Sequence, residues 1–321
     1  MRILNPIYDT VFKYLMEDIE IAKGFISAII EQEVIELIPA PQETTSTKIK
    51  IQYASLEIQH LDYVAHIKTI NADGNEEYER VMIEVQKSPF APAIGRFRKY
   101  LAEKYKNISV IKTKAGEEKI YLPLKTIYII DKTFNENLPC ILKRNSQYID
   151  VLNKTEYAGK KDKFVELLTH EAWFIQLQKL PHDLKTTITR LLSVFTPWYR
   201  VKGDERYLNF PVEDDDLKKI KNQVLRRVLR RLFAAVKNDK LKLAMEIEIE
   251  YEDFFEQQIE IAKKYKKEKE EKEKQLKQEI EAKNAEHQKV LNSAKEMKKF
   301  GMTMEIIIKT TGLSKEEIGK L

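Results

Sequence analysis

The sequence predicts an α/β domain followed by a helical C-terminal region, and three observations support this fold class. Apolar residues recur at helical spacing over about residues 6–32. Segments typical of β-strands follow, separated by turn residues. Beyond Phe164 the pattern is helical again. The order helix, β-hairpin, helix, strand describes a compact domain whose strands end near Asp131.

The first helical stretch begins at Asn5-Pro6, where Asn can cap a helix and Pro fits its first position. We expect it to be interrupted near Glu17–Ile19. A loop rich in Pro, Thr and Ser is predicted over Glu36–Thr47. The later elements are strands at Lys48–Ile58 and Leu61–Ile70, a turn at Asn71–Gly74, a strand at Tyr78–Val85 ending before Pro89 and Pro92, a helix at Ala93–Tyr105 and a buried strand at Leu124–Ile130.

Length and composition limit the possible classes of protein. The chain has 321 residues, which suggests about two domains, and a net charge of +5, which permits a polyanionic partner without requiring one. The single cysteine, Cys140, excludes an internal disulfide and a zinc cluster built on cysteine. The first nine residues lack a signal-peptide pattern, and no apolar run reaches the roughly 18–20 residues of a membrane span. We therefore expect a soluble, cytoplasmic protein without a membrane partner.

Polar residues on the predicted hairpin indicate a metal site. Because alternate residues of a strand share a face, Asp62 can lie beside Glu84 and Gln86. Two neighbouring carboxylates repel each other unless a cation compensates, and Mg²⁺ prefers such hard oxygen ligands. A bound divalent ion can activate water for attack on phosphorus. The alternative is an ordinary polar, solvent-facing side of a hairpin.

The same residues resemble a known group of nucleases. Leu61-Asp62, followed by Ile83-Glu84-Val85-Gln86, is similar to the PD-(D/E)xK nuclease superfamily, in particular its recombination-promoting nuclease or PD-(D/E)xK family transposase branch. That branch opens on an Asp-x-x-Phe-Lys helix, which Asp9–Lys13 matches. Arg96 and Tyr100 match its Arg and Tyr on the helix after the Glu-x-Gln strand. The resemblance covers about residues 1–180 and returns in the tail Lys298–Leu321.

This resemblance implies a restriction-endonuclease-like core, a mixed sheet flanked by helices, that hydrolyses DNA phosphodiesters with Mg²⁺ or Mn²⁺, with a link to recombination or mobile elements. The implied metal ligands are Asp62, Glu84, the backbone carbonyl of Val85, and Asp9. Gln86 stands where the superfamily usually has Lys, so Lys13 could supply the missing charge, whereas alternation points Lys87 away. The implied substrate-binding residues are Arg96 and Tyr100.

Blander interpretations of these residues stay open. Asp9 and Lys13 could be an ordinary exposed pair on a helix, and Arg96 and Tyr100 could merely pack. Gln86 in place of Lys also suits an inactive nuclease fold that acts as an interaction or DNA-binding module. His66 shares the face of Asp62, but a surface histidine is the simpler reading because no second His lies at ligand spacing.

The C-terminal half is predicted to be all-helical. Residues 1–180 would form the nuclease-like domain, 181–260 a helical region, 261–293 a charged Lys/Glu helix or coil, and 294–321 a short helix pair with Ser314 capping the second helix. The run Leu217–Arg231 carries seven basic residues and no acid, which suits phosphate contacts or pairing with the acidic stretch Glu246–Glu260. The C-terminal helices could also form a homo-oligomer.

Overall fold

The computed structural model describes residues 1–40, 46–51, 54–59, 63–71, 74–87, 91–113, 116–157, 159 and 162–321. The chain divides into two compact units, Met1–Ile249 and Glu250–Leu321. Each unit has a hydrophobic core of its own. Among the described residues, no helix contains an apolar stretch long enough to cross a membrane.

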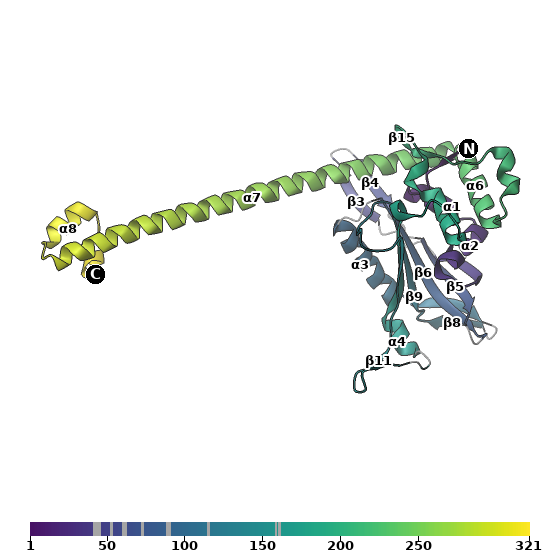
Figure 1. Cartoon of the computed structure of the whole chain (residues 1–321), viewed down its shortest axis with the longest axis horizontal. Coiled ribbons are helices and arrows are strands. Elements are labelled where there is room, and N and C mark those ends of the chain that lie inside the picture. The colour runs from purple at the N-terminus through teal and green to yellow at the C-terminus, as the bar shows by residue number, and fades with distance from the viewer. Residues whose placement is uncertain are drawn as a thin grey trace. The chain divides into compact units, whose positions relative to one another are not determined.

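The first unit is built on a six-stranded mixed sheet (Figure 1). Its strand order is β10-β13-β9-β6-β5-β2, and β9 pairs in parallel with both β6 and β13 whereas the other pairs are antiparallel. The bounds are β2 Val34–Pro39, β5 Tyr63–Ile70, β6 Glu76–Gln86, β9 Leu124–Ile130, β10 Ile141–Arg144 and β13 His170–Gln176. The predicted strands at Leu61–Ile70, Tyr78–Val85 and Leu124–Ile130 are thus confirmed where they are described.

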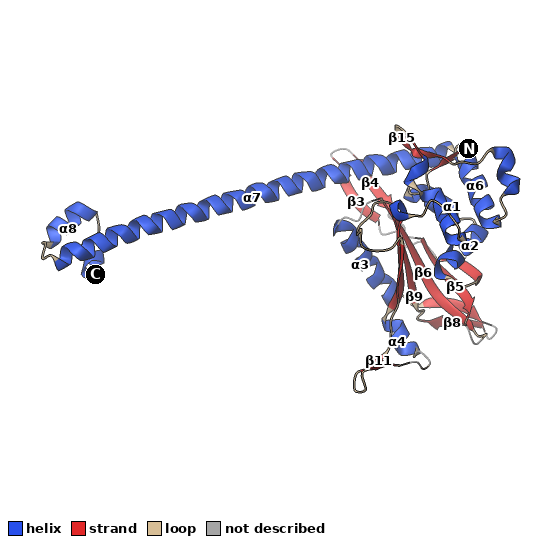
Figure 2. Ribbon diagram, viewed as in Figure 1, coloured by secondary structure: helices blue, strands red, loops and turns tan. Residues whose placement is uncertain are grey.

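Helices lie on both faces of this sheet (Figure 2). The helix α3 (Ala91–Lys106) covers one face, in agreement with the predicted helix, and packs on β5, β6 and β9 through Tyr100. The other face is covered by α1 Asp9–Met16, α2 Ile19–Ile30, α5 Thr187–Leu192 and α6 Gln223–Ala235. Burial of both faces explains why all seven residues of β9 are buried.

The main core lies between the sheet and the α1 side. Phe12, Phe25 and Phe195 form its centre, with ring centroids 5.7–6.3 Å apart. Ile83 of β6 and Ile127 of β9 belong to the same cluster. Since side chains alternate along a strand, the residues on either side of Ile83 point to the α3 face. This alternation fixes which side of the sheet each candidate residue occupies.

The N-terminal helical stretch is broken where expected, because Asp18 caps α2 by accepting hydrogen bonds from the backbone N–H groups of Glu20 and Ile21. Its predicted start is wrong. The Asn5 side chain accepts a hydrogen bond from the backbone N–H of Ile7 at 3.1 Å and forms a turn, and α1 begins only at Asp9. Asn can stabilise a turn by the same hydrogen bond with which it caps a helix, so the sequence does not distinguish the two.

Two further sequence predictions need correction. The predicted strand Lys48–Ile58 is two strands, β3 (Ser46–Ile51) and β4 (Ala54–Gln59), which pair antiparallel; the residues between them are Gln52 and Tyr53, which give no turn signal. The predicted loop Glu36–Thr47 overlaps the strand β2. The proline at the end of β2 is tolerated there because β2 is an edge strand of its sheet.

The prediction of an all-helical C-terminal region is also wrong. After the short helix α4 (Lys163–Leu168) the chain adds β13 to the central sheet, and then forms β14 (Arg200–Val201) and β15 (Asp204–Asn209). A short apolar run such as that of β13 has no period that separates a buried strand from a helix. The strand β15 pairs with β1 (Arg2–Leu4), about 200 residues earlier in the chain, and so depends on a contact that no local pattern shows.

The remaining elements of the first unit are short. They are β7 Ser109–Thr113 with β8 Gly116–Ile120, β11 Ile149–Asp150 with β12 Thr155–Glu156, α4 Lys163–Leu168, and 3₁₀ turns at Leu177–Lys179, Ser193–Phe195, Pro197–Tyr199 and Asp214–Lys219.

The helix α7 (Asp239–Lys299) begins in the first unit and continues through the second. It is followed by α8 (Met304–Thr311) and α9 (Lys315–Gly319). Gly312 ends α8 with a φ of 72°, a left-handed conformation that glycine adopts without strain. The predicted cap is confirmed, because Ser314 and Glu317 form a capping box at the start of α9.

Two half-buried histidines on the α3 side of the sheet should make the free energy of unfolding decrease in acid. Burial, and the nearby Arg80 and Arg144 respectively, lower the pKa of His66 and of His170. The unfolded chain therefore binds protons near pH 6.5 while the folded chain does not, so stability falls as the pH drops from about 7 towards 5. Urea denaturation at both pH values should show a smaller fall for the variant His66→Gln/His170→Gln. An equal fall in both proteins would contradict this cause.

Candidate functional site

The best-defined candidate residues lie near the C-terminal end of β6. Glu84 points to the α3 side of the sheet, because Ile83 belongs to the core on the other side and Val85 packs against that core. The Glu84 side chain is buried, with 6% exposed. Gln86, two residues further along the same face, donates a hydrogen bond from Nε2 to Glu84 Oε1 at 2.7 Å. Glu84 is therefore not on a solvent-facing side of a hairpin.

Among the described residues, aromatic and apolar side chains lie near Glu84. Tyr128, its neighbour on β9, stacks on Phe174 with ring centroids 5.0 Å apart. Along β6, Met82 packs with Tyr100 of α3. In such a setting the field of a carboxylate is poorly screened, which strengthens its attraction for a cation. A buried carboxylate with a positioned amide beside it is thus a suitable hard ligand for a divalent ion.

The partner carboxylate Asp62 lies outside the described residues, as does the side chain of Arg96. The described part of β5 begins at Tyr63, which pairs with Ile83. Tyr100 is buried, with 7% exposed, and its ring packs with Val64 and Met82. The ring of Tyr100 thus belongs to the core, and a contact of its hydroxyl with substrate stays a prediction.

Asp9 and Lys13 lie on α1, whose buried residues pack on the opposite face of the sheet from Glu84. Lys13 forms an ion pair with Asp9 one helical turn earlier, as expected. Lys87 lies on this side too, with Nζ 3.4 Å from the centre of the Tyr8 ring, so the prediction that it points away from Glu84 is confirmed. A role for Asp9 and Lys13 with Glu84 stays a prediction.

A contact that the sequence did not predict holds the start of α1. Its cap residue, Tyr8, makes no side-chain cap. Instead, Glu248 of α7 accepts hydrogen bonds from the backbone N–H of Asp9 at 2.8 Å, and from the backbone N–H and hydroxyl of Thr10 at 3.0 and 2.8 Å. A carboxylate at a helix N-terminus satisfies unpaired N–H groups and the helix dipole. Glu248 therefore fixes the part of the chain that carries Asp9.

We expect Glu248→Ala to lower the free energy of unfolding by about 1–2 kcal/mol, the usual loss for a helix cap with charged hydrogen bonds. The matched control is Glu246→Ala on the same helix, which removes only an exposed ion pair with Arg206 and should cost under about 1 kcal/mol. Urea denaturation measures both. An equal loss in the two variants would show that the contact with α1 adds nothing to stability.

The end of β9 carries a second unpredicted arrangement. Asp131 is buried, with 4% exposed, and forms an ion pair with Arg200. The backbone N–H of Asp131 donates to the carbonyl of Gln86 at 2.8 Å, so this pair lies beside the strand end that carries the candidate site. Arg200 is 69 residues away in the chain, and no local pattern links the two.

Two arginines of the basic run pair within the chain, with other acids than those expected, and contacts of the rest of the run with phosphate stay a prediction. Arg227 Nε lies 2.6 Å from Asp18, and Arg231 contacts Glu17 at 2.9 Å. These acids lie between α1 and α2, not in Glu246–Glu260. The run therefore attaches α6 to the helix pair that covers the sheet.

Among the described residues, no three or more His, Cys, Asp or Glu side chains are gathered closely enough to hold a metal ion. Asp62, which the predicted metal site needs, is not among the residues searched. His66 lies 3.1 Å from the Ser109 hydroxyl and next to Arg80, and this setting does not suit a metal ligand.

The comparisons with known proteins found no relative of this chain. No family model, no curated protein and no solved structure matches this chain. The fold and the candidate site define an α/β protein with a mixed central sheet and a buried carboxylate at the end of a central strand.

Proposed function

We propose that this protein is a Mg²⁺- or Mn²⁺-dependent DNA endonuclease of the PD-(D/E)xK type. The observation that carries the proposal is Glu84, a buried carboxylate on a central strand that receives a hydrogen bond from Gln86. Mg²⁺ and Mn²⁺ bind carboxylate and carbonyl oxygens, and the residues that would hold the ion are Glu84, Asp62 and the carbonyl of Val85.

Asp62 directly precedes Tyr63 in the sequence, and Tyr63 pairs with Ile83. The proposal requires this antiparallel pairing to continue by one residue, which would put Asp62 opposite Glu84 on the α3 side. Asp9, with its partner Lys13, would contribute from α1 only if substrate or metal extends around the end of the sheet.

In the proposed mechanism the metal supplies an activated water and stabilises charge on the phosphate. The chain's own residues would orient the reacting groups and keep bulk water away from them. Glu84 holds a fixed orientation because Gln86 donates to one of its oxygens. The amide oxygen of Gln86 remains a hydrogen-bond acceptor that can orient an attacking water. The aromatic pair Tyr128 and Phe174 limits the access of bulk water from the side of β9.

A plasmid-nicking assay tests this proposal. Purified protein with Mg²⁺ or Mn²⁺ should convert supercoiled DNA to the nicked form, and Glu84→Ala should not. Equal activity in wild type and variant would remove the assignment. A link to recombination or mobile elements rests on the sequence resemblance alone and needs a test in cells.

One observation favours a second function. Gln86 occupies the position where the superfamily usually has Lys, and its amide is engaged by Glu84. This arrangement suits an inactive nuclease fold that binds DNA or another protein. Such a protein would bind DNA in the presence of Mg²⁺ and leave it intact, with an affinity that falls steeply as salt is added.

A further inference from the structure

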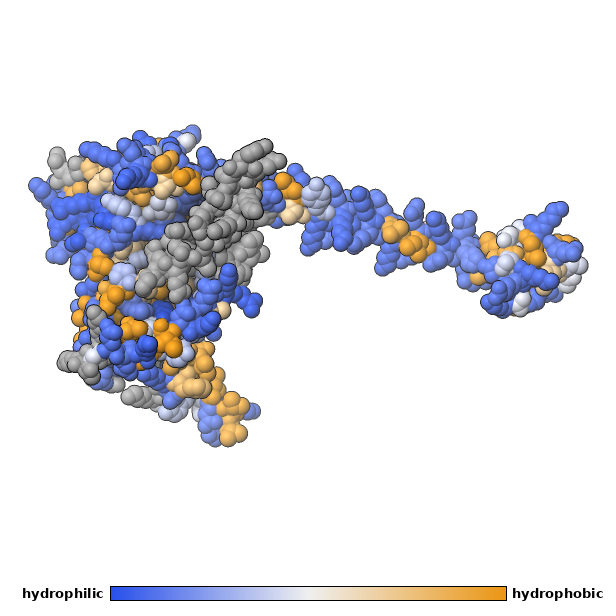
Figure 3. Space-filling view, turned by 180° about the vertical axis from the view of Figure 1, so that it is seen from behind, coloured by the Kyte–Doolittle hydropathy of each residue, from blue (hydrophilic) through white to orange (hydrophobic). Residues whose placement is uncertain are grey.

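The middle of α7, in the second unit, is exposed on all sides. Every residue from Glu260 to Lys289 is exposed, over a length of about 45 Å. Figure 3 shows this part of the chain as mainly hydrophilic, with separate hydrophobic groups along it. A helix that is polar all round has no packed face to stabilise it, so its own residues must keep it helical.

The residues of this stretch favour a helix. Of the 30 residues from Glu260 to Lys289, 25 are Ala, Leu, Gln, Glu or Lys, which are among the residues with the highest helix propensity. The other five are Ile261, Tyr265, Ile280, Asn284 and His287, so the stretch contains no Gly and no Pro. It is also longer than the roughly 12–15 residues below which an isolated helix is marginal in water.

The order of the charges adds to this preference. Residues four apart are neighbours on a helix surface, and ten pairs at this spacing have opposite charges, whereas only Lys263 and Lys267 have like charges. The ten pairs are Glu260 with Lys264, Lys264 with Glu268, Lys266 with Glu270, Lys267 with Glu271, Glu268 with Lys272, Lys269 with Glu273, Glu270 with Lys274, Glu273 with Lys277, Lys277 with Glu281 and Glu279 with Lys283. At a spacing of two residues, which does not bring side chains together, five pairs are opposite and six alike, so composition alone does not explain the bias.

The helix surface as a whole therefore carries more attractive than repulsive neighbours. Residues three apart are neighbours too, and at that spacing five pairs are opposite and seven alike. The two spacings together give fifteen opposite pairs and eight like pairs. In the structure Lys266 Nζ lies 3.9 Å from Glu270 Oε1, and Lys269 Nζ lies 3.8 Å from Glu273 Oε1. These ion pairs join residues four apart, the spacing at which opposite charges prevail.

The exposed apolar residues of this stretch do not form a continuous seam for a second helix. Tyr265 and Leu276 lie on one side of α7, with a gap of 11 residues, or three turns, that contains no apolar residue. Lys269 and Lys272 lie on this side within the gap. A helix pair needs apolar residues at every third or fourth position and would bury these two ammonium groups at a cost. The sequence therefore disfavours a partner helix here.

We propose that residues 260–289, which we call the α7 spacer, form a single α-helix that is stable without a partner helix and acts as a rigid spacer. Further along α7, Ala294 is fully buried in a cluster with Ile307 of α8 and Ile318 of α9. The α7 spacer holds this cluster roughly 50 Å from Glu260. The proposal does not depend on the nuclease assignment, since no candidate site residue takes part.

Electron-spin distance measurements on the full chain test the α7 spacer. In a background that carries Cys140→Ser, spin labels on Ala262→Cys and Ala285→Cys are 23 residues apart, which is about 35 Å in a straight helix. Neither change removes a charge. The distances should form a single narrow peak near this value, whereas a flexible chain of the same length would give a broad distribution centred near about 24–29 Å.

Two controls complete this experiment. Gln275→Pro in the doubly labelled chain should broaden the peak, because proline interrupts the helix near the centre of the α7 spacer. A chain labelled only at Gln275→Cys should show no defined distance to a second copy, since no partner helix lies beside it. A broad distribution without the proline, or a defined distance between copies labelled at Gln275→Cys, would overturn the proposal.

Hydrogen exchange of the full chain tests the contribution of the charges. Glu268→Gln/Glu270→Gln removes four of the ten opposite pairs and keeps residues of similar helix propensity. Amides of the α7 spacer should exchange roughly three- to tenfold faster in this variant. The matched control is Glu286→Gln/Glu296→Gln on the same helix, where neither residue has an opposite charge four residues away. Equal exchange rates in the two variants would refute stabilisation by the order of the charges.

Discussion

Glu84→Gln is expected to lower Mg²⁺-dependent nicking of plasmid DNA at least a hundredfold. Altering a residue that merely supports a metal ligand costs about 10–100-fold, and the loss of a ligand charge should cost more. Glutamine keeps the shape of the side chain and can still accept the hydrogen bond from Gln86, so the fold should persist.

Two measurements separate this result from a general loss of structure. Urea denaturation of Glu84→Gln should show a cooperative unfolding transition, as wild type does, because the fold persists. The matched control is Glu118→Gln, a change of the same type at an exposed position of β8, which should nick at the wild-type rate. Nicking by Glu84→Gln within twofold of wild type would contradict a role for this carboxylate.

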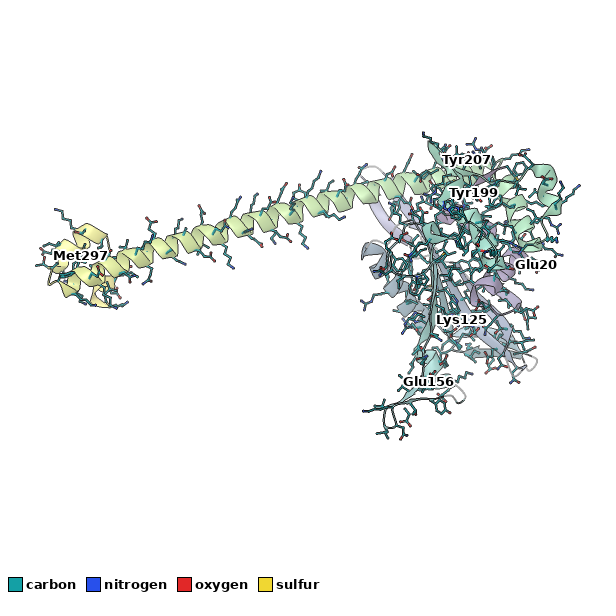
Figure 4. All side chains as sticks on the ribbon, viewed as in Figure 1. Glu20, Lys125, Glu156, Tyr199, Tyr207 and Met297 are labelled. Atoms are coloured by element: carbon teal, nitrogen blue, oxygen red, sulfur yellow. The ribbon has the colours of Figure 1, made fainter. Side chains whose placement is uncertain are left out.

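The largest expected effect on stability is at Lys125, whose ammonium group lies inside the first unit. Lys125 on β9 is 5% exposed, and its Nζ lies 2.7 Å from Glu79 Oε2 and 2.6 Å from Gln32 Oε1 (Figure 4 labels Lys125). Burial raises the pKa of Glu79, and the attraction of Lys125 only partly offsets this. Without Lys125, the Glu79 carboxylate would be buried with no cation beside it.

Lys125→Met should therefore cost about 3–5 kcal/mol in urea denaturation at neutral pH, the usual result of removing one partner of a buried ion pair. The double variant Glu79→Leu/Lys125→Met should recover most of this loss, because it buries no charge. The single variant should regain stability as the pH falls, because a folded-state pKa above the unfolded value favours the protonated, folded form at low pH. A cost below about 1 kcal/mol at neutral pH would contradict this account.

The central part of the fold could be predicted because its signals are local. The strand Tyr78–Val85 and the helix Ala93–Tyr105 were found to within two residues at each end, since periodicity and prolines define them. The strands β13 and β15 could not be predicted in this way. Their identity depends on partners far away in the chain, and a run such as Ala172–Ile175 suits a strand or a helix equally.

The candidate site was predictable in part for the same reason. Alternation along β6 correctly put Glu84 and Gln86 on one face and Lys87 on the other. The burial of Glu84 depends on what packs beside it on β9 and α3, and this is not written in the strand itself. The contact of Glu248 with the start of α1 joins residues about 240 apart, so only a folded chain reveals it.

The most direct test of the metal site is a calorimetric titration of the full protein with Mg²⁺. Wild type should take up the ion at one saturable site, and Glu84→Gln and Asp62→Asn should each lose that site, while Glu118→Gln retains it. Saturable binding that survives unchanged in both Glu84→Gln and Asp62→Asn, or wild type that takes up no Mg²⁺, would contradict a metal centre built on these two carboxylates.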